Sequence, residues 1–228
     1  TLWILCAPSA QDVLPTIRSR TRIVNLAVPP VDAIAAFLQE STGVDAHKAK
    51  QFARLAQGHI GIARLYATQP EAVRMRNNIV DNLVSMTRTS QAVLLAQELC
   101  ASAQDQAQSS IDAQVEAQQK EFRRSHGLAD DDLIDASVRS QYNAIGKKDD
   151  VKRRVTRLSR DVVDRALTTI ASVYRDIAVI HNNAEMVSGL INQEFSEEIA
   201  AMSVRVSRQH AVDAIQCIDV ARRRIHGN

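Results

Sequence analysis

The feature that most constrains the fold is a helical repeat of apolar residues in the C-terminal half of the chain. These residues follow one another at alternating spacings of four and three: Val163, Leu167, Ile170, Tyr174 and Ile177. This spacing places side chains on one face of an α-helix, whereas a strand brings every second residue to one face. The 228 residues include only seven glycines and five prolines, and 4% are aromatic. The sequence therefore predicts a mostly helical protein rather than a β-sandwich or barrel.

Three short helices are expected between residues 27 and 70. Pro30 opens the first, Asp45 is the expected N-cap of the second, and Gly58 is its expected C-cap. The third continues to about Pro70. Three helices in so short a stretch indicate a compact module.

The N-terminal residues suggest strands rather than helices. Residues 2–6 are apolar throughout, which is typical of a strand buried on both faces, and residues 22–26 form a second β-like run. Two strands do not make a sheet, so we expect residues 1–26 to be the end of an α/β domain in a longer protein. Residues 71–228 are expected to form an antiparallel helical bundle.

A polar insertion interrupts that bundle at about residues 101–160. The stretch "ADDDLID" within it is acidic, and residues 147–160 hold seven basic residues against two acidic ones. We expect a solvated, mobile segment or a long exposed helix. Pairing with the acidic stretch and binding to nucleic-acid phosphates are the alternatives. The candidate residues for a nucleic-acid or partner patch are Lys152, Arg153, Arg154 and Arg157.

The cysteines and the net charge exclude several classes of protein. Cys6, Cys100 and Cys217 lie far apart without metal-ligand spacing, so we expect reduced, buried thiols in a cytoplasmic protein and no zinc site. The formal net charge of +2 does not by itself indicate nucleic-acid binding. No apolar run is long enough to cross a membrane.

Motifs for catalysis are missing from these residues. There is no GxxxxGK[ST], GxGxxG, HExxH or GxSxG pattern, and the paired carboxylates have no catalytic partner in sequence. We therefore expect no active site and no cofactor within this chain alone. Five scattered histidines are expected at the surface or in helix caps: His47, His59, His126, His181 and His210.

Residues 14–24, "LPTIRSRTRIV", contain arginines at every second position: Arg18, Arg20 and Arg22. Arginine keeps its charge and is costly to bury. One interpretation is that all three solubilise an exposed edge strand. The other is that one of them reaches a group in another molecule.

The same stretch resembles the segment after the fourth core strand of clamp-loader AAA+ proteins, which reads "LPxTIxSRC". Leu14, Ile17, Ser19 and Arg20 match this pattern, while Thr21 stands in place of the cysteine. The resemblance implies that Ser19 and Arg20 form the family's catalytic signature. Arg20 would then be an arginine finger that acts in trans on the ATP of a neighbouring subunit.

Two nucleotide-sensing positions of the family are altered. Residues 55–68 resemble the sensor 2 helix of the lid domain, but Gly61 stands where the arginine is usual. Ala7 and Pro8 replace the polar residues of sensor 1. An outward arginine beside degraded sensors resembles the delta-prime subunits of the bacterial DNA polymerase III clamp loader, and the basic-rich insertion before residue 159 resembles their actinobacterial members.

This resemblance implies an AAA+ core tail at residues 1–26, a lid at 27–70 and a collar domain at 71–228. The implied partners are gamma/tau and delta subunits, with the sliding clamp and primed DNA reached through the pentamer. The implied process is DNA replication by the DNA-directed DNA polymerase holoenzyme. Two alternatives stay open: a gamma/tau-type motor subunit, and a helical DNA-binding or adaptor module that uses residues 147–160.

Overall fold

The computed structural model describes residues 2–7, 9–129 and 132–227, and it is mostly helical. Within these ranges there is no β-strand. The chain divides into two compact units, Thr1–Thr68 and Gln69–Asn228. The helical fold class is therefore confirmed, whereas an α/β tail is not observed.

The first unit contains the three expected short helices, α2 (Val31–Thr42), α3 (Ala46–Leu55) and α4 (Ile60–Thr68). The Asp45 side chain accepts a hydrogen bond of 2.9 Å from the backbone N–H of Lys48, as the predicted N-cap of α3. Gly43 ends α2 with a φ of 69°, a conformation that glycine adopts at little cost. The three helices share one apolar core: Ile34, Leu38, Ala49, Phe52, Ala63 and Tyr66.

The two predicted strands do not form. Residues 2–6 and 22–26 are irregular and exposed, and the Trp3 side chain is 83% exposed. A strand needs a neighbour to pair with its backbone N–H and C=O groups, and no described part of this chain supplies one. Between these segments lie two single turns, η1 (Ala10–Asp12) and α1 (Pro15–Arg18).

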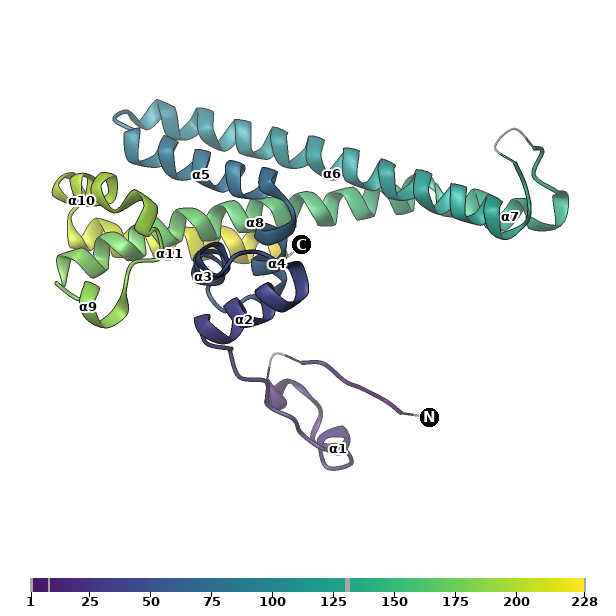
Figure 1. Cartoon of the computed structure of the whole chain (residues 1–228), viewed down its shortest axis with the longest axis horizontal. Coiled ribbons are helices and arrows are strands. Elements are labelled where there is room, and N and C mark those ends of the chain that lie inside the picture. The colour runs from purple at the N-terminus through teal and green to yellow at the C-terminus, as the bar shows by residue number, and fades with distance from the viewer. Residues whose placement is uncertain (1, 8, 130–131, 228) are drawn as a thin grey trace. The chain divides into compact units, whose positions relative to one another are not determined.

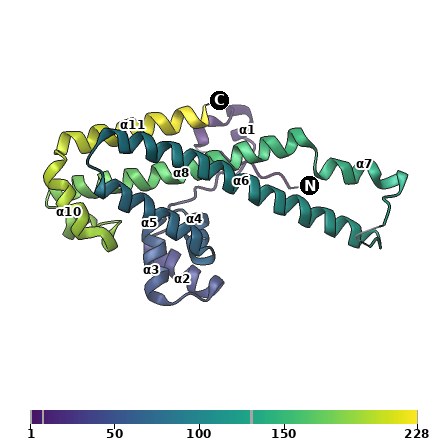
Figure 2. The ribbon, with the colours of Figure 1, turned by 90° about the horizontal axis from the view of Figure 1, so that it is seen from above.

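The second unit is a helical bundle around one long helix. Its longest elements are α5 (Pro70–Ser85), α6 (Thr89–Ser125), α8 (Lys148–His181) and α11 (Arg208–His226). The shorter ones are α7 (Ala136–Ile145), α9 (Glu185–Ser188), η2 (Gln193–Phe195) and α10 (Ser196–Arg205). Helices α5, α6, α10 and α11 all pack against α8 (Figures 1 and 2).

Because helices surround α8, its buried residues cover more than the predicted stripe. Ile177 is fully buried, but Val163, Leu167, Ile170 and Tyr174 are only partly buried. Val162 and Val173 are buried beside them, together with the polar Thr169, Ser172 and Asp176. The main core of the unit joins α8 to α5, α10 and α11: Val80, Leu83, Val84, Val173, Ile177, Ile199, Met202 and Ala211.

The polar insertion is helical throughout most of its length, which agrees with the predicted long exposed helix rather than a mobile segment. The end of α6, α7 and the beginning of α8 form a long antiparallel hairpin (Figure 1), here called the helical arm (residues 101–160). A small core between α6 and α8 holds it together: Ala107, Ile111 and Val155, with Val115, Val151 and Leu158 partly buried. Ala107 has a small side chain, which lets the two helices approach closely.

The acidic stretch makes local hydrogen bonds. Asp132 accepts one from the backbone N–H of Ala129 at 2.6 Å, and Asp135 accepts one from Ser137 at 2.8 Å. Residues 130–131 lie outside the described residues. The predicted pairing of this stretch with residues 147–160 is not observed among the described carboxylates, which cap neighbouring turns instead.

The prediction that the cysteines are buried is wrong. Cys6, Cys100 and Cys217 are all exposed and carry free thiols. Cys6 lies in the irregular N-terminal segment, while Cys100 and Cys217 lie on outward faces of α6 and α11. Cysteine is often buried in proteins, but its presence in a helix does not indicate whether it lies on the face that the bundle covers.

Four of these five histidines lie at the surface as predicted, whereas the ring of His181 packs inward with Nε2 2.8 Å from the carbonyl oxygen of Val206. His47, His59, His126 and His210 are exposed and His181 is partly buried. His59 Nδ1 accepts from the backbone N–H of Ile62 at 3.3 Å at the start of α4.

None of the described helices combines the length and apolar character that crossing a lipid bilayer requires.

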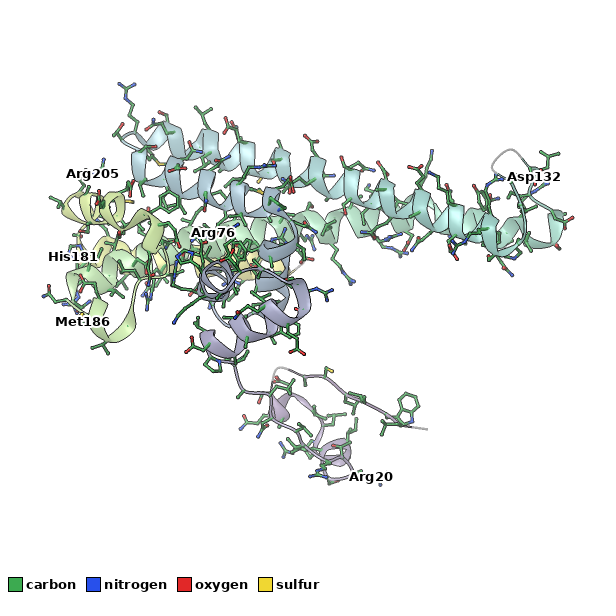
Figure 3. The ribbon with its side chains drawn as sticks, in the orientation of Figure 1. Arg20, Arg76, Asp132, His181, Met186 and Arg205 are labelled. Atoms are coloured by element: carbon green, nitrogen blue, oxygen red, sulfur yellow. The ribbon has the colours of Figure 1, made fainter. Side chains whose placement is uncertain are left out.

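A buried polar cluster fixes the loop before α10 to α8. The fully buried Asp176 carboxylate accepts hydrogen bonds from the backbone N–H groups of Ile191 and Asn192 at 3.0 and 2.8 Å. It also accepts from Asn192 Nδ2 at 2.7 Å and from Arg175 Nη1 at 2.9 Å. Arg76 of α5, in the interior of this unit (Figure 3), donates to Asn192 Oδ1. The cluster thus links α5, α8 and the loop.

Candidate functional site

Arg20 follows a short turn whose backbone is held by several hydrogen bonds. The hydroxyl of Ser19 donates to the carbonyl of Thr16 at 3.2 Å, and the N–H of Arg20 donates to the carbonyl of Ile17 at 3.0 Å. The Thr21 hydroxyl donates to the same Ile17 carbonyl at 3.2 Å. Arg20 is exposed at the end of this turn (Figure 3). A guanidinium in this position can form bidentate bonds to a phosphate of another molecule.

Arg18 and Arg22 differ from Arg20 in their surroundings. Arg18 is partly buried and donates from Nη1 to the carbonyl of Ala10 at 3.4 Å, which connects α1 with η1. Arg22 lies exposed in the irregular segment. Their predicted role on an edge strand is wrong, because neither residue lies in a strand.

The two altered sensor positions offer no charged or hydroxyl side chain. Gly61 is exposed in α4 and has no side chain, and Arg64 is exposed three residues later. Ala7 is exposed as well, while Pro8 lies outside the described residues. Within the described part of the chain, no group of three His, Cys, Asp or Glu residues is arranged to hold a metal ion.

The basic patch forms one wall of a groove of about 580 Å³ between α8 and the end of α11, here called the basic groove. Its lining residues are Lys152, Arg153, Thr156, Arg157, Arg160, Asp161, Ile225 and His226. Of the four predicted patch residues, Lys152, Arg153 and Arg157 lie in the groove. Arg154 does not, because its Nη2 donates to Gln114 Oε1 of α6 at 2.9 Å.

Arg160 lies within the predicted patch at residues 147–160 but was not among its four named residues, and the contribution of α11 was not predicted. The spacing of Arg153, Arg157 and Arg160 was the available signal, because four and three residues place side chains on one helix face. Nothing in the sequence indicated that the end of α11 lies beside that face, since this depends on the packing of helices distant in sequence.

Asp164 anchors the end of α11 to α8 next to the groove. Arg222 donates to both carboxylate oxygens, with Nε–Oδ1 at 2.7 Å and Nη2–Oδ2 at 3.0 Å, and His226 Nε2 lies 3.2 Å from Oδ1. Hydrogen bonds from Arg222, and then from His226, hold the pKa of Asp164 below its usual value. The carboxylate in turn raises the pKa of Arg222.

We expect Asp164→Asn to lower the free energy of unfolding at pH 7 by about 1 kcal/mol, because Arg222 is 37% exposed and solvent screens the pair. A carboxyl whose pKa is lowered by folding stabilises the protein above its unfolded pKa, and this stabilisation is lost as the pH falls through the folded pKa. The difference from the parent should therefore begin to shrink near pH 3.9 and vanish only once the pH has fallen through the lower pKa of the folded state. Urea unfolding at several pH values measures it.

Asp161→Asn is the matched control, since Asp161 is exposed one turn away on the same helix. A destabilisation by Asp164→Asn that stayed constant down to pH 3 would show that the ion pair does not contribute. An equal loss in Asp161→Asn would point to a general effect of charge on α8.

Comparisons with known proteins identify no relative: no protein family, curated protein or solved structure matches this chain.

Proposed function

We propose that this chain is the C-terminal part of a non-hydrolysing clamp-loader subunit of the delta-prime type. The observation that carries the proposal is Arg20, an exposed guanidinium that follows a hydrogen-bonded turn. The residues around it match the family's signature at Leu14, Ile17 and Ser19. The sensor position at Gly61 could not serve a nucleotide bound by the subunit itself.

In this proposal Arg20 completes the ATP site of the neighbouring subunit. A guanidinium keeps its charge at all physiological pH values and matches the geometry of phosphate oxygens. It would stabilise the negative charge that develops on the transferred phosphoryl group. The turn from Pro15 to Thr21 would hold its backbone, so that little ordering is required when the subunits meet.

The rest of the chain would serve assembly. The three helices α2–α4 support a lid at residues 27–70, and the bundle that begins at α5 supports a collar domain. The partners would be gamma/tau and delta subunits, and the sliding clamp and primed DNA would be reached through the pentamer. The protein would act in the cytoplasm during replication, and the ATP would be held by the neighbour.

A gamma/tau-type motor subunit is the second candidate within the same complex. It would need a side chain at position 61 that contacts its own nucleotide, and Gly61 has none. The delta-prime assignment is therefore the one we favour.

ATP hydrolysis by a reconstituted clamp loader tests the proposal. The full-length subunit carrying Arg20→Ala should assemble and bind DNA, and its DNA-stimulated hydrolysis should fall. Unchanged hydrolysis in such a complex would exclude Arg20 as a finger.

A further inference from the structure

We propose that the basic groove binds the phosphate backbone of duplex DNA, without reading its sequence. The groove lies on the helical unit and does not involve Arg20, so this inference is independent of the proposed role in ATP hydrolysis. It rests on the arrangement of charges along α8 and on the way α11 completes the site.

The basic side chains form a row along one face of α8. Arg153, Arg157 and Arg160 follow at spacings of four and three residues, and the row spans about 10 Å along the helix axis. Val155 and Leu158 lie on another face and pack toward α6 in the core of the helical arm. The row is therefore held on a packed helix, and the side chains of Arg153 and Arg157 are exposed on it.

The acidic residues near the row do not cancel it. Asp164, the next position in the same spacing, is bound by Arg222 in a bidentate ion pair. Asp150 contacts Arg153 at 3.4 Å, but both side chains are exposed, and such a pair is weak and easily exchanged. Asp161 lines the groove beside four basic residues: Lys152, Arg153, Arg157 and Arg160. The local charge is thus strongly positive in a chain of net charge +2.

The surroundings of the row favour a polyanion over a protein partner. Ile225 is an apolar lining residue, whereas protein interfaces usually bury a cluster of apolar or aromatic anchors. Duplex DNA carries a charge about every 1.7 Å along its axis, which a straight row of arginines can neutralise at several points.

The residues that line the basic groove also favour a DNA duplex over a single strand as its ligand. Sites for single strands stack bases on aromatic side chains, and the described lining residues include no Phe, Tyr or Trp. Lys and Arg contacts to phosphates position a duplex without specifying sequence.

Fluorescence anisotropy of a labelled DNA duplex, titrated with the 228-residue chain at several salt concentrations, tests the site. Three neutralised phosphates, at the exposed Lys152, Arg153 and Arg157, predict a slope of log K against log salt of about −2.7. Arg157→Gln should reduce the magnitude of this slope by about one and weaken binding about eightfold at 0.1 M salt.

Arg154→Gln is the matched control, because it removes the same charge from the same helix. The Arg154 guanidinium binds Gln114 on α6 rather than lining the groove. We therefore expect its slope and affinity to stay close to those of the parent chain. Circular dichroism should show that both variants keep their helical content.

Several results would overturn the proposal. They are the absence of duplex binding at low salt, equal losses in the two variants, and tighter binding of a single strand of the same sequence. Tighter binding of labelled polyglutamate would assign the groove to an acidic protein surface instead. If inorganic phosphate displaced the duplex as efficiently as competing DNA at equal phosphate concentration, the groove would be a simple anion site.

Discussion

A clamp loader reconstituted with Arg20→Ala should hydrolyse ATP at the site facing this subunit at least about 10³-fold more slowly than the parent complex. The guanidinium is expected to act on the charge of the transition state, so ATP binding and assembly should change little. Total DNA-stimulated turnover should fall by the share that this site contributes. Single-turnover hydrolysis with radiolabelled ATP measures the effect directly.

Two neighbouring arginines provide the controls for this prediction. Arg22→Ala removes an equally exposed charge two residues away and should leave hydrolysis unchanged. Arg18→Ala removes the hydrogen bond to Ala10, so a small loss of order in the turn is expected without a specific loss of turnover. Arg20→Lys should lose most of the activity, because an ammonium lacks the fork of the guanidinium. If Arg22→Ala were as harmful as Arg20→Ala, the finger would be misassigned.

Asp176→Ala should have the largest effect on stability, lowering the free energy of unfolding by about 3–5 kcal/mol. The Asp176 side chain is 0% exposed and accepts hydrogen bonds from the backbone of Ile191 and Asn192. Its removal leaves these buried N–H groups without acceptors and leaves a charge on Arg175 without its carboxylate. Urea unfolding followed by circular dichroism measures the loss.

Asp81→Ala, on the exposed face of α5, is the control and should change stability by less than about 0.5 kcal/mol. If Asp176→Ala gives too little folded protein, Asp176→Asn provides a second variant of nearly the same shape. It should be less stable than the parent, because its amide NH₂ would face N–H donors. A parent-like free energy of unfolding in either Asp176 variant would contradict the structural role of the cluster.

The sequence predicted the elements whose signals are local. Asp45 marked the start of α3, since an N-cap depends on residues within one turn, whereas α3 is capped at Ala56 and not at the predicted Gly58. The apolar spacing around Ile177 indicated α8. It did not predict that Thr169, Ser172 and Asp176 would be buried, because this depends on which helices surround α8.

The errors have the same origin in distant contacts. Residues 2–6 are apolar enough for a buried strand, but a strand forms only where another pairs with it. The patch at residues 147–160 was recognised from composition. Composition did not show that Arg157 lines the groove while Arg154 binds Gln114, because this depends on how α6 and α11 pack against α8. The ion pair of Asp164 and Arg222 joins residues far apart in sequence and left no local signal.

If this chain belongs to a clamp-loader subunit, as we propose, the mass of the complex that it enters should show it. The full-length subunit, mixed with gamma/tau and delta subunits and analysed by native mass spectrometry, should appear as one copy in a pentamer. The assembly should survive Arg20→Ala, because the helical unit rather than the finger would hold it together. A folded subunit that stayed separate from the others under these conditions would exclude the proposed role in a clamp loader.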